Sequence, residues 1–387
     1  MLTYLAALLT EPAHFLLSLT PLSRLLPSID HFAPHPTAPF EGYYTRIVTP
    51  SHGSILLILS SVRQAEDKPH YIHFSHIPSA SEPQDKALQI DVFPTITDVL
   101  GECKESGFQE FTRVVSDGIG YFRTAEGEQK YSLRLPDPES EGGDESVVEV
   151  EVTITQRAPW IKGDALSTPE GAFSNLVHLL PLHWNVFSHK SMAEYTVKRG
   201  GELWLQGTGI AHSEKNWGVS FPTGWTWIQG FSDHKDHAGT SSFSLAGGKI
   251  LGQKAFLLGY RSPKYSISFA PPTTLFPFSI PTPFCYEEHD SKAGTLSLRA
   301  DNLVGTRRIV ISVAGPTNHE GWVALNCPLS TGHGNKFAYE TFEATLFVVI
   351  SERRWPWQEW VQVETAQFTN AALEFGGDYS FKLKDSV

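Results

Sequence analysis

The chain has 387 residues, 41% of them hydrophobic, which is enough for buried cores in two domains or in one large one. The formal net charge of -12 and the lack of a basic run argue against nucleic acid as a partner, because an acidic surface repels phosphate backbones. Three scattered cysteines, Cys103, Cys285 and Cys327, have neither the pattern of a disulfide framework nor the spacing of a metal site.

Residues 1–38 are predicted to form an apolar helical segment. The stretch MLTYLAALLTEPAHFLLSLTPLSRLL has no basic residue before its apolar run, and Glu11 and His14 interrupt that run. It is also too short and too broken to span a bilayer. We expect this segment to pack on the body of the protein or on a membrane surface, and we expect an intracellular, cytoplasmic protein. A cleaved N-terminal signal is the alternative.

From residue 39 onward the sequence predicts an all-β protein. Short runs rich in β-branched and aromatic residues, such as GSILLILSSV and VVEVEVTITQR, alternate with Gly, Pro, Asn, Asp and Ser. Roughly fifteen or more such runs exceed the needs of one eight-stranded barrel. They fit two barrels or sandwiches in series.

Two strand-like segments early in the chain carry polar side chains among aromatic ones. In FEGYYTRI (40–47), Glu41 and Tyr43 share one face of the predicted strand. In LPLHWNVFSHK (180–190), His183 and Asn185 point one way and Trp184 the other. A histidine with an asparagine two residues later can hold a ligand oxygen or donate a proton. The alternative is an ordinary histidine in a core.

HSEKNWGVSFPTGWTWIQG (212–230) is the densest polar and aromatic stretch of the chain. Alternation places Trp225, Trp227 and Gln229 on one face of a strand, where two indoles and an amide can hold a flat apolar ligand and its oxygen. Glu214 and Lys215 precede this strand, and such residues are almost never fully buried unless paired. They indicate either a structural ion pair or a polarised cavity, and tryptophans that simply fill a barrel remain an alternative.

Motifs for other chemistries are absent. The sequence contains no GxGxxG after a strand, no GxxxxGK[ST], no HExxH and no GxSxG. The string HKDH (234–237) has a spacing that a metal could use, but it reads as a wet turn between strands. The sequence therefore predicts no metal site and no cofactor.

Four strings in chain order resemble tocopherol cyclase, the family that closes the chroman ring of vitamin E. They are FEGYY (40–44), HWN (183–185), SEKNWG followed by FP and WTWIQ (213–229), and AALEFGG (371–377). The resemblance implies two lipocalin-like β domains, over residues 39–218 and 219–387, with the densest stretch at their junction. Domain junctions are a preferred location for ligand pockets. Tyr43 and Asn185 depart from the family's tryptophan and glutamine, so the resemblance implies the fold and leaves the substrate open.

The resemblance also implies a reaction. A cyclase of this kind joins a phenol- or tropolone-derived oxygen to an isoprenoid alkene without a cofactor, either by acid-assisted closure or by hetero-Diels–Alder addition of an ortho-quinone methide. On this reading the protein is a pericyclase or cyclase of meroterpenoid secondary metabolism. Its expected partner is an apolar isoprenoid or aromatic small molecule.

Roles for individual residues follow as expectations. We expect Glu214 and His183 to share the acid–base work, with Lys215 beside them. The substrate-binding set would comprise Tyr43, Trp184, Asn185, Asn216, Trp217, Trp225, Trp227 and Gln229. Three alternatives remain open: a structural corner in SEKNWG, a lipocalin-like carrier of apolar ligands without chemistry, and an olefin hydratase.

Overall fold

The computed structural model of the chain describes residues 30–381, apart from 51–52, 80–86, 104–108, 117, 126, 141–145, 172–173, 175–179, 233–238, 251, 278–279, 281, 319–320 and 334–335. The helical segment expected over residues 1–38 lies outside the described residues up to residue 29, and residues 30–39 form turns. The HKDH string also lies outside. In the described part of the chain, no helix has the length and apolarity to cross a membrane.

The first half of the protein is one antiparallel sheet of eleven strands. Their order across the sheet is β4-β3-β2-β1-β11-β10-β9-β8-β7-β6-β5. The strands are β1 (Phe40–Thr49), β2 (Gly53–Val62), β3 (His70–Ile77), β4 (Leu88–Val92), β5 (Thr97–Cys103), β6 (Gln109–Val115), β7 (Gly120–Ala125), β8 (Glu128–Pro136), β9 (Val147–Thr155), β10 (Leu182–Arg199) and β11 (Glu202–Gly218).

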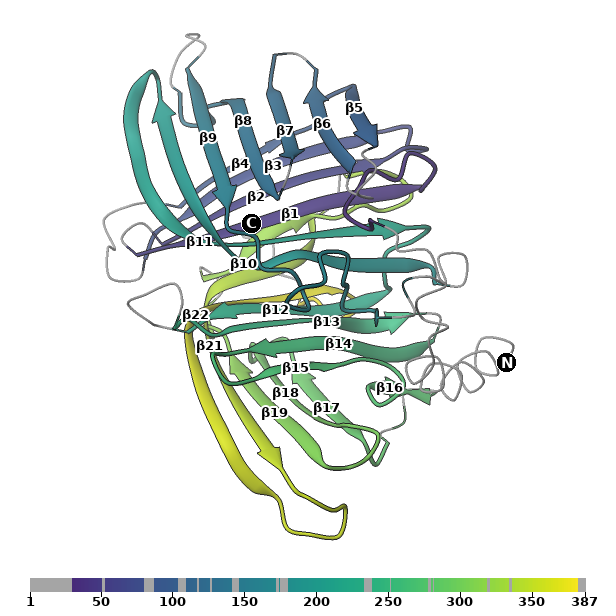
Figure 1. Ribbon diagram of the computed structural model, residues 1–387. Coiled ribbons are helices and arrows are strands. Elements are labelled where there is room, and N and C mark those ends of the chain that lie inside the picture. Colours follow the sequence, from purple (N-terminus) through teal and green to yellow (C-terminus); the bar gives the residue numbers. More distant parts are fainter. Residues whose placement is uncertain are drawn as a thin grey trace.

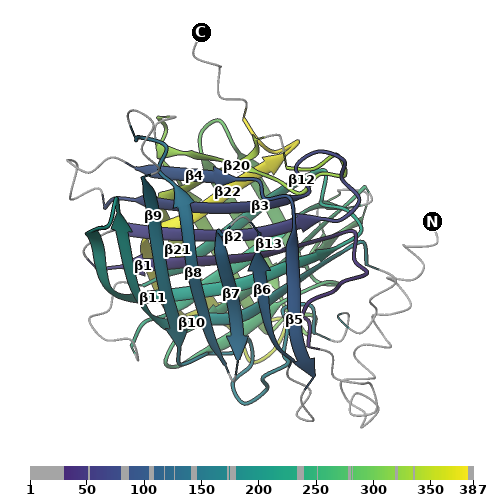
Figure 2. The same cartoon turned by 90° about the horizontal axis from the view of Figure 1, so that it is seen from above.

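This sheet curls over itself, so that β5–β9 lie across β1–β4 (Figures 1 and 2). The long strands β10 and β11 belong to both layers, because β11 pairs with β1 and β10 pairs with β9. Irregular pairing between Val186 and Ser191 marks the bend in β10. A continuous apolar core, which includes Tyr43, Leu57 and Phe122, fills the space between the layers.

The second half repeats this plan in a separate sheet of eleven strands. Its main order is β15-β14-β13-β12-β22-β21-β19-β18-β17, with β16 paired to β14 and β20 paired to β21. The strands are β12 (Gly224–Phe231), β13 (Ser242–Ile250), β14 (Gln253–Arg261), β15 (Ser266–Phe269), β16 (Leu275–Phe276), β17 (Cys285–Asp290), β18 (Thr295–Asp301), β19 (Arg307–Ala314), β20 (Val323–Asn326), β21 (Lys336–Glu352) and β22 (Val361–Gly377).

These two curled sheets confirm the prediction of an all-β protein with two lipocalin-like units in tandem. The first sheet ends at Gly218 and the second begins at Gly224. We propose each sheet, with its connections, as one domain with the limits predicted from the sequence.

The two sheets pack against each other through β1 and β2 on one side and β12, β21 and β22 on the other (Figure 1). Leu56 of the first sheet meets Trp227 and Phe342 of the second in one apolar cluster. Because both faces of β12 are covered, every residue from Gly224 to Phe231 is buried. Trp227 faces the first sheet, whereas Ile228 belongs to the core of the second, as alternation predicts.

Candidate active site

A cavity of about 380 Å³ lies between the two sheets, within the range typical of small-molecule sites. The wall is mostly apolar, and both sheets contribute to it. The first sheet and its connections provide Phe40, Gly42, Tyr43, Tyr44, Ile58, Ser60, Glu170, Leu180, Pro181, Leu182, Trp184, Glu214 and Asn216. The second half of the chain provides Phe221, Pro222, Trp225, Thr226, Trp227, Ala246, Gly247, Ile250, Gln253, Ala255, Leu257, Pro271, Pro272, Leu275, Leu325, Asn326, Cys327, Pro328 and Glu374.

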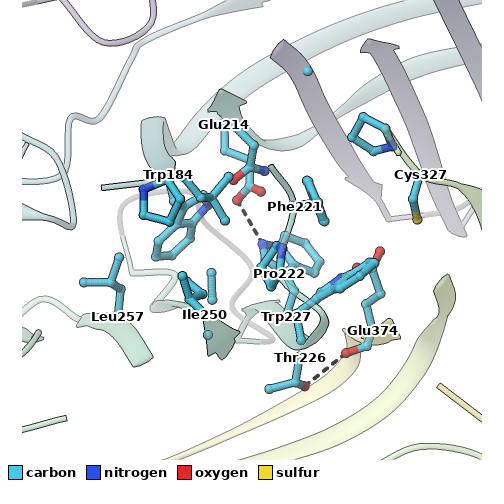
Figure 3. Close-up of a pocket in the computed structure, with 18 of the residues that line it drawn as sticks. Trp184, Glu214, Phe221, Pro222, Thr226, Trp227, Ile250, Leu257, Cys327 and Glu374 are labelled. Atoms are coloured by element: carbon cyan, nitrogen blue, oxygen red, sulfur yellow. Dashed lines mark hydrogen bonds between the residues drawn. The ribbon is translucent and has the colours of Figure 1, made fainter. Parts of the chain in front are cut away.

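Figure 3 shows how this wall is arranged. Trp184 and Leu257 lie on one side of the cavity, and Glu374 and Cys327 lie on the other. Glu214 enters from the first sheet and meets Trp227 of the second. A ligand in this space would therefore contact indoles and carboxyl groups at once.

Three carboxyl groups lie at the interface between the two sheets: Glu214 and Glu340 are buried, and Glu374, in the lining, is partly buried. Trp227 donates its indole N–H to Glu214 over 3.0 Å, and the imidazole of His212 lies 2.9 Å from the same oxygen. Glu374 accepts the indole N–H of Trp225. Behind them, Glu340 accepts the hydroxyl of Tyr44 over 2.6 Å.

The surroundings of Glu374 and Glu340 favour the protonated forms of these two carboxyl groups. Burial, together with the negative charge of Glu214, raises the pKa of Glu374 to about 7, although the hydrogen bond from Trp225 opposes the shift. Burial and the nearby Glu374 raise the pKa of Glu340 well above its ordinary value. Glu374 can therefore be a neutral acid near neutral pH, which is the property that a general acid needs.

A fourth carboxyl group, Glu170, lies in the lining next to Trp184. One of its oxygens accepts the backbone N–H of Trp184 over 2.6 Å, and the other lies 2.8 Å from His183 Nδ1. His183 itself is buried, stacks on Trp217 at 4.2 Å and is not part of the lining. Its position suits orienting Glu170 better than contacting a ligand.

Lys215 points away from the cavity. The Glu214–Lys215 pairing considered from the sequence does not form, because adjacent residues of a strand face opposite sides of the sheet. Lys215 instead lies 3.0 Å from Glu41 and 2.8 Å from the imidazole of His35, inside the first sheet. Burial lowers the pKa of Lys215 to about 8, while Glu41 opposes that shift.

Glu41 is the centre of this second, internal cluster. Its side chain accepts hydrogen bonds from Arg63 over 2.5 Å and from Arg113 over 2.6 Å, in addition to its contact with Lys215. Burial alone would raise the pKa of Glu41, but these three cations hold it well below its usual range. The cluster is a compensated buried charge network inside the first sheet, and Glu41 and Lys215 are not part of the cavity lining.

Six of the eleven residues predicted for the site line the cavity, and five do not. Those in the lining are Tyr43, Trp184, Glu214, Asn216, Trp225 and Trp227. Those outside it are His183, Asn185, Lys215, Trp217 and Gln229. Gln229 shares a strand face with Trp227 as predicted, but its amide oxygen accepts a hydrogen bond from Arg46 over 2.8 Å. The Tyr43 hydroxyl is directed to the carbonyl of Phe32 over 3.3 Å, in the first core.

The sequence reasoning missed Tyr44, Glu170, Glu340 and Glu374. A signal for Glu374 was present, since it is the carboxylate of the AALEFGG string. Tyr44 lies next to Tyr43 in FEGYY, on the face that turned out to meet the second sheet. Within the described residues, no group of three or more His, Cys, Asp or Glu side chains is placed to hold a metal ion.

Comparisons with known proteins agree with this architecture. CghA has a TM-score of 0.52 and 8% sequence identity, over 92% of this chain and 96% of its own, which shows a shared fold. Kievitone hydratase from Nectria haematococca has a TM-score of 0.49 and 11% identity, over 91% of this chain and 93% of its own. No curated protein sequence matches the chain.

A sequence model described as tocopherol cyclase-like matches residues 32–377, which is nearly the whole described chain. The match supports an enzyme in general, of a cyclase-like family. By this match, the chain belongs to the tocopherol cyclase-like family.

Proposed function

We propose that this enzyme closes an oxygen heterocycle, of the chroman or dihydropyran type, by joining a phenol- or tropolone-derived oxygen to an isoprenoid alkene. The reaction requires no cofactor in this proposal and belongs to the biosynthesis of an aromatic terpenoid natural product. The observation that carries the proposal is a group of three carboxyls beside an apolar cavity, held by indole and phenol donors: the buried Glu214 and Glu340 and the partly buried Glu374.

The proposed step is an acid-assisted addition. The neutral carboxyl of Glu374 gives its proton to one alkene carbon, and the alkene's π electrons form the new C–H bond. The cation left on the other carbon is attacked by the phenolic oxygen, which forms the C–O bond. The phenolic proton then passes to a carboxylate of the same cluster, so that the product is an isomer of the substrate.

The cavity suits this step in two ways. Holding the oxygen and the alkene near attack geometry can lower the barrier by about 7–11 kcal/mol. The indole faces of Trp184, Trp225 and Trp227 can stabilise the developing cation by about 0.5–2 kcal/mol each when water is excluded. An ortho-quinone methide that adds across an alkene would use the same walls, and it would need a hydrogen-bond donor such as Glu374 on its oxygen.

The test is turnover of defined substrates without added cofactor. The protein would be incubated with prenylated phenols, and separately with an ortho-quinone methide precursor and a terpene alkene. The products would be analysed by chiral chromatography. We expect a cyclic ether in excess of one enantiomer. Equal yields and a racemic product with and without protein would exclude a cyclase.

The same experiment in ¹⁸O-labelled water distinguishes ring closure from the two alternative functions, olefin hydration and carriage of an apolar ligand. A hydratase would give an alcohol that carries the label, whereas a cyclic ether retains the phenolic oxygen. A carrier would bind the substrate and release it unchanged. Either outcome would reject the proposed reaction.

A further inference from the structure

The hairpin that joins β21 to β22 carries an exposed aromatic tip far from the candidate active site. In Figure 1 this hairpin extends beyond the rest of the second sheet. Trp355 and Trp357 are 48% and 78% exposed, and their rings stack at 5.4 Å. Soluble proteins rarely leave two adjacent indoles exposed to water, so we expect this tip to bind a partner.

A second loop adds apolar surface at the same place. The turn between β18 and β19 approaches the tip, where the Arg353 guanidinium donates to the carbonyl of Gly305 over 2.6 Å. Leu303 and Val304 of that turn are 47% and 60% exposed. Residues 302–307 and 352–361 together form the hairpin tip.

The hairpin tip is also locally basic in an acidic protein. It contains three arginines and two glutamates, in a chain with a formal net charge of -12. Arg307 pairs with Glu352 over 2.6 Å, and Arg353 lies over the ring of Trp360 at 4.0 Å. Arg354 is exposed. Exposed indoles flanked by guanidinium groups match the boundary between lipid headgroups and acyl chains, where tryptophan and arginine are both favoured.

The size of the surface favours a lipid bilayer over a protein. Two indoles at these exposures offer on the order of 300 Å² of apolar area, and Leu303 and Val304 add a smaller area, whereas a specific protein interface buries about 800 Å² on each partner. A projecting tip is also convex, and it can enter a headgroup layer without a matching surface. We propose that the hairpin tip docks on membranes that contain anionic lipids, with Trp355 and Trp357 inserted at the headgroup level and Arg354 facing the phosphates.

Vesicle binding by the full-length protein tests this proposal. Sedimentation with vesicles of phosphatidylcholine alone and of phosphatidylcholine mixed with phosphatidylserine would give two affinities, and we expect tighter binding to the mixed vesicles. The Trp355→Ser/Trp357→Ser double variant should bind at least about tenfold more weakly, because both inserted rings are lost. Arg354→Glu should remove most of the preference for anionic vesicles, because headgroup attraction depends on local basic residues.

A matched control is Leu203→Ser, at the β10–β11 hairpin of the first sheet, where Leu203 is 57% exposed. It should leave vesicle binding unchanged, and all variants should keep the wild-type melting temperature because the altered side chains are exposed. The proposal fails if the wild-type protein does not bind either vesicle, or if the tryptophan double variant binds as well as wild type. It also fails if the tryptophan double variant binds vesicles normally but no longer self-associates in sedimentation velocity experiments. The indoles would then contact a second copy of the chain.

Discussion

At Glu374 the environment of one side chain sets the expected chemistry. Its carboxyl group lies in an apolar wall and accepts only the indole N–H of Trp225 among the contacts described. In Glu374→Gln that acceptor remains, but the transferable proton is lost. General acid catalysis typically contributes about 10²–10⁴-fold, so we expect kcat to fall by about that factor. The check is kcat for ring closure, with ligand affinity measured in parallel to show that the cavity is intact.

The pH dependence of the rate has a defined sign. Burial raises the pKa of Glu374 to about 7, and the active form is the protonated one. Activity should therefore be high below about pH 7 and fall as the pH rises through that value. In Glu374→Gln, the residual rate should lack this alkaline decline. A decline of equal size in both proteins would show that another group is the general acid.

Glu374 should also mark the pH dependence of stability. A carboxyl whose folded pKa lies above its unfolded value stabilises the fold below the unfolded value and loses that contribution as pH rises through the folded one. We expect the melting temperature of wild type, relative to Glu374→Gln, to fall between about pH 5 and about pH 8. A difference that stays constant over this window would show that Glu374 is ionised throughout. Thermal unfolding of the two proteins at matched pH values is the measurement.

The internal cluster around Glu41 gives a prediction about stability. Glu41→Ala leaves Lys215 and Arg113 buried without their counter-charge, and breaking a buried ion pair in this way costs about 3–5 kcal/mol in unfolding free energy. Lys215→Met should cost less, because Arg63 and Arg113 still neutralise Glu41. Denaturant unfolding measures both losses.

The same pair of variants tests the role of Lys215. Because its side chain does not line the cavity, Lys215→Met should keep turnover per folded molecule near the wild-type value. A large fall in kcat with normal stability would show that Lys215 takes part in catalysis, as expected from the sequence.

Sequence reasoning at the residue level identified which side chains are close along a strand, but not which face of the strand meets the second sheet. Alternation separates Glu214 from Lys215, yet both are buried, one in the cavity wall and one in the core of the first sheet. Both faces of β1, and of β11 from residue 211 to residue 218, are covered, so burial leaves no polar side to orient these strands. The face assignment depends on contacts with residues such as Glu340 and Glu374, which lie more than a hundred positions away.

At the scale of elements, the pairing of β12 with β22 sets the position of one cavity wall. Gly376 lies opposite Trp225 in this pair, and a Cβ atom on Gly376 would come within 2.0 Å of the indole ring. Only a residue without a side chain allows Trp225 to lie across β22 at this point. The sequence showed the two glycines of AALEFGG, but the reason for the first of them appears only when the two strands are paired.

Gly376→Ala should therefore displace Trp225 from the cavity wall. We expect a loss of about 1–3 kcal/mol in stability from overpacking, and a weaker affinity for apolar ligands. The milder control is Gly230→Ala on β12, where the nearest atom to the new Cβ, on the Phe368 ring, would be 3.2 Å away. Calorimetric ligand binding to both variants is the measurement. Wild-type affinity in Gly376→Ala would show that the Trp225 ring does not shape the site.

The long strands show where element prediction from sequence stops. The short apolar runs predicted the strands themselves, and the run GSILLILSSV coincides with β2. β10, however, has 18 residues and passes through a region of irregular pairing near Ser188. Nothing in the local alternation indicates that one strand will serve two layers, because the bend is set by pairing with β11 and β9.

At the scale of the whole molecule, the strand count was sufficient to predict two β units, whereas the way they join depends on a few buried polar contacts. Arg46 of β1 is fully buried and reaches across to the second sheet. It donates to Gln229 Oε1 over 2.8 Å and to the carbonyl of Asn370 over 2.5 Å. In the sequence, Arg46 is simply followed by Ile47 at the end of FEGYYTRI. Nothing in this string indicates that Arg46 bonds to Asn370, more than three hundred residues away.

Arg46 should consequently couple the two sheets. Arg46→Met leaves acceptors of the second sheet buried without a donor, at about 1–3 kcal/mol each, so the junction should weaken more than either core. We expect thermal unfolding to broaden or divide into two transitions and ligand affinity to fall, because the cavity wall needs both sheets. Arg113→Met is the control: Arg113 is equally buried but bonds to Glu41 within the first sheet, so its loss should lower stability without uncoupling the sheets. One sharp transition with wild-type affinity in Arg46→Met would show that the apolar cluster of Leu56, Trp227 and Phe342 holds the junction without the arginine.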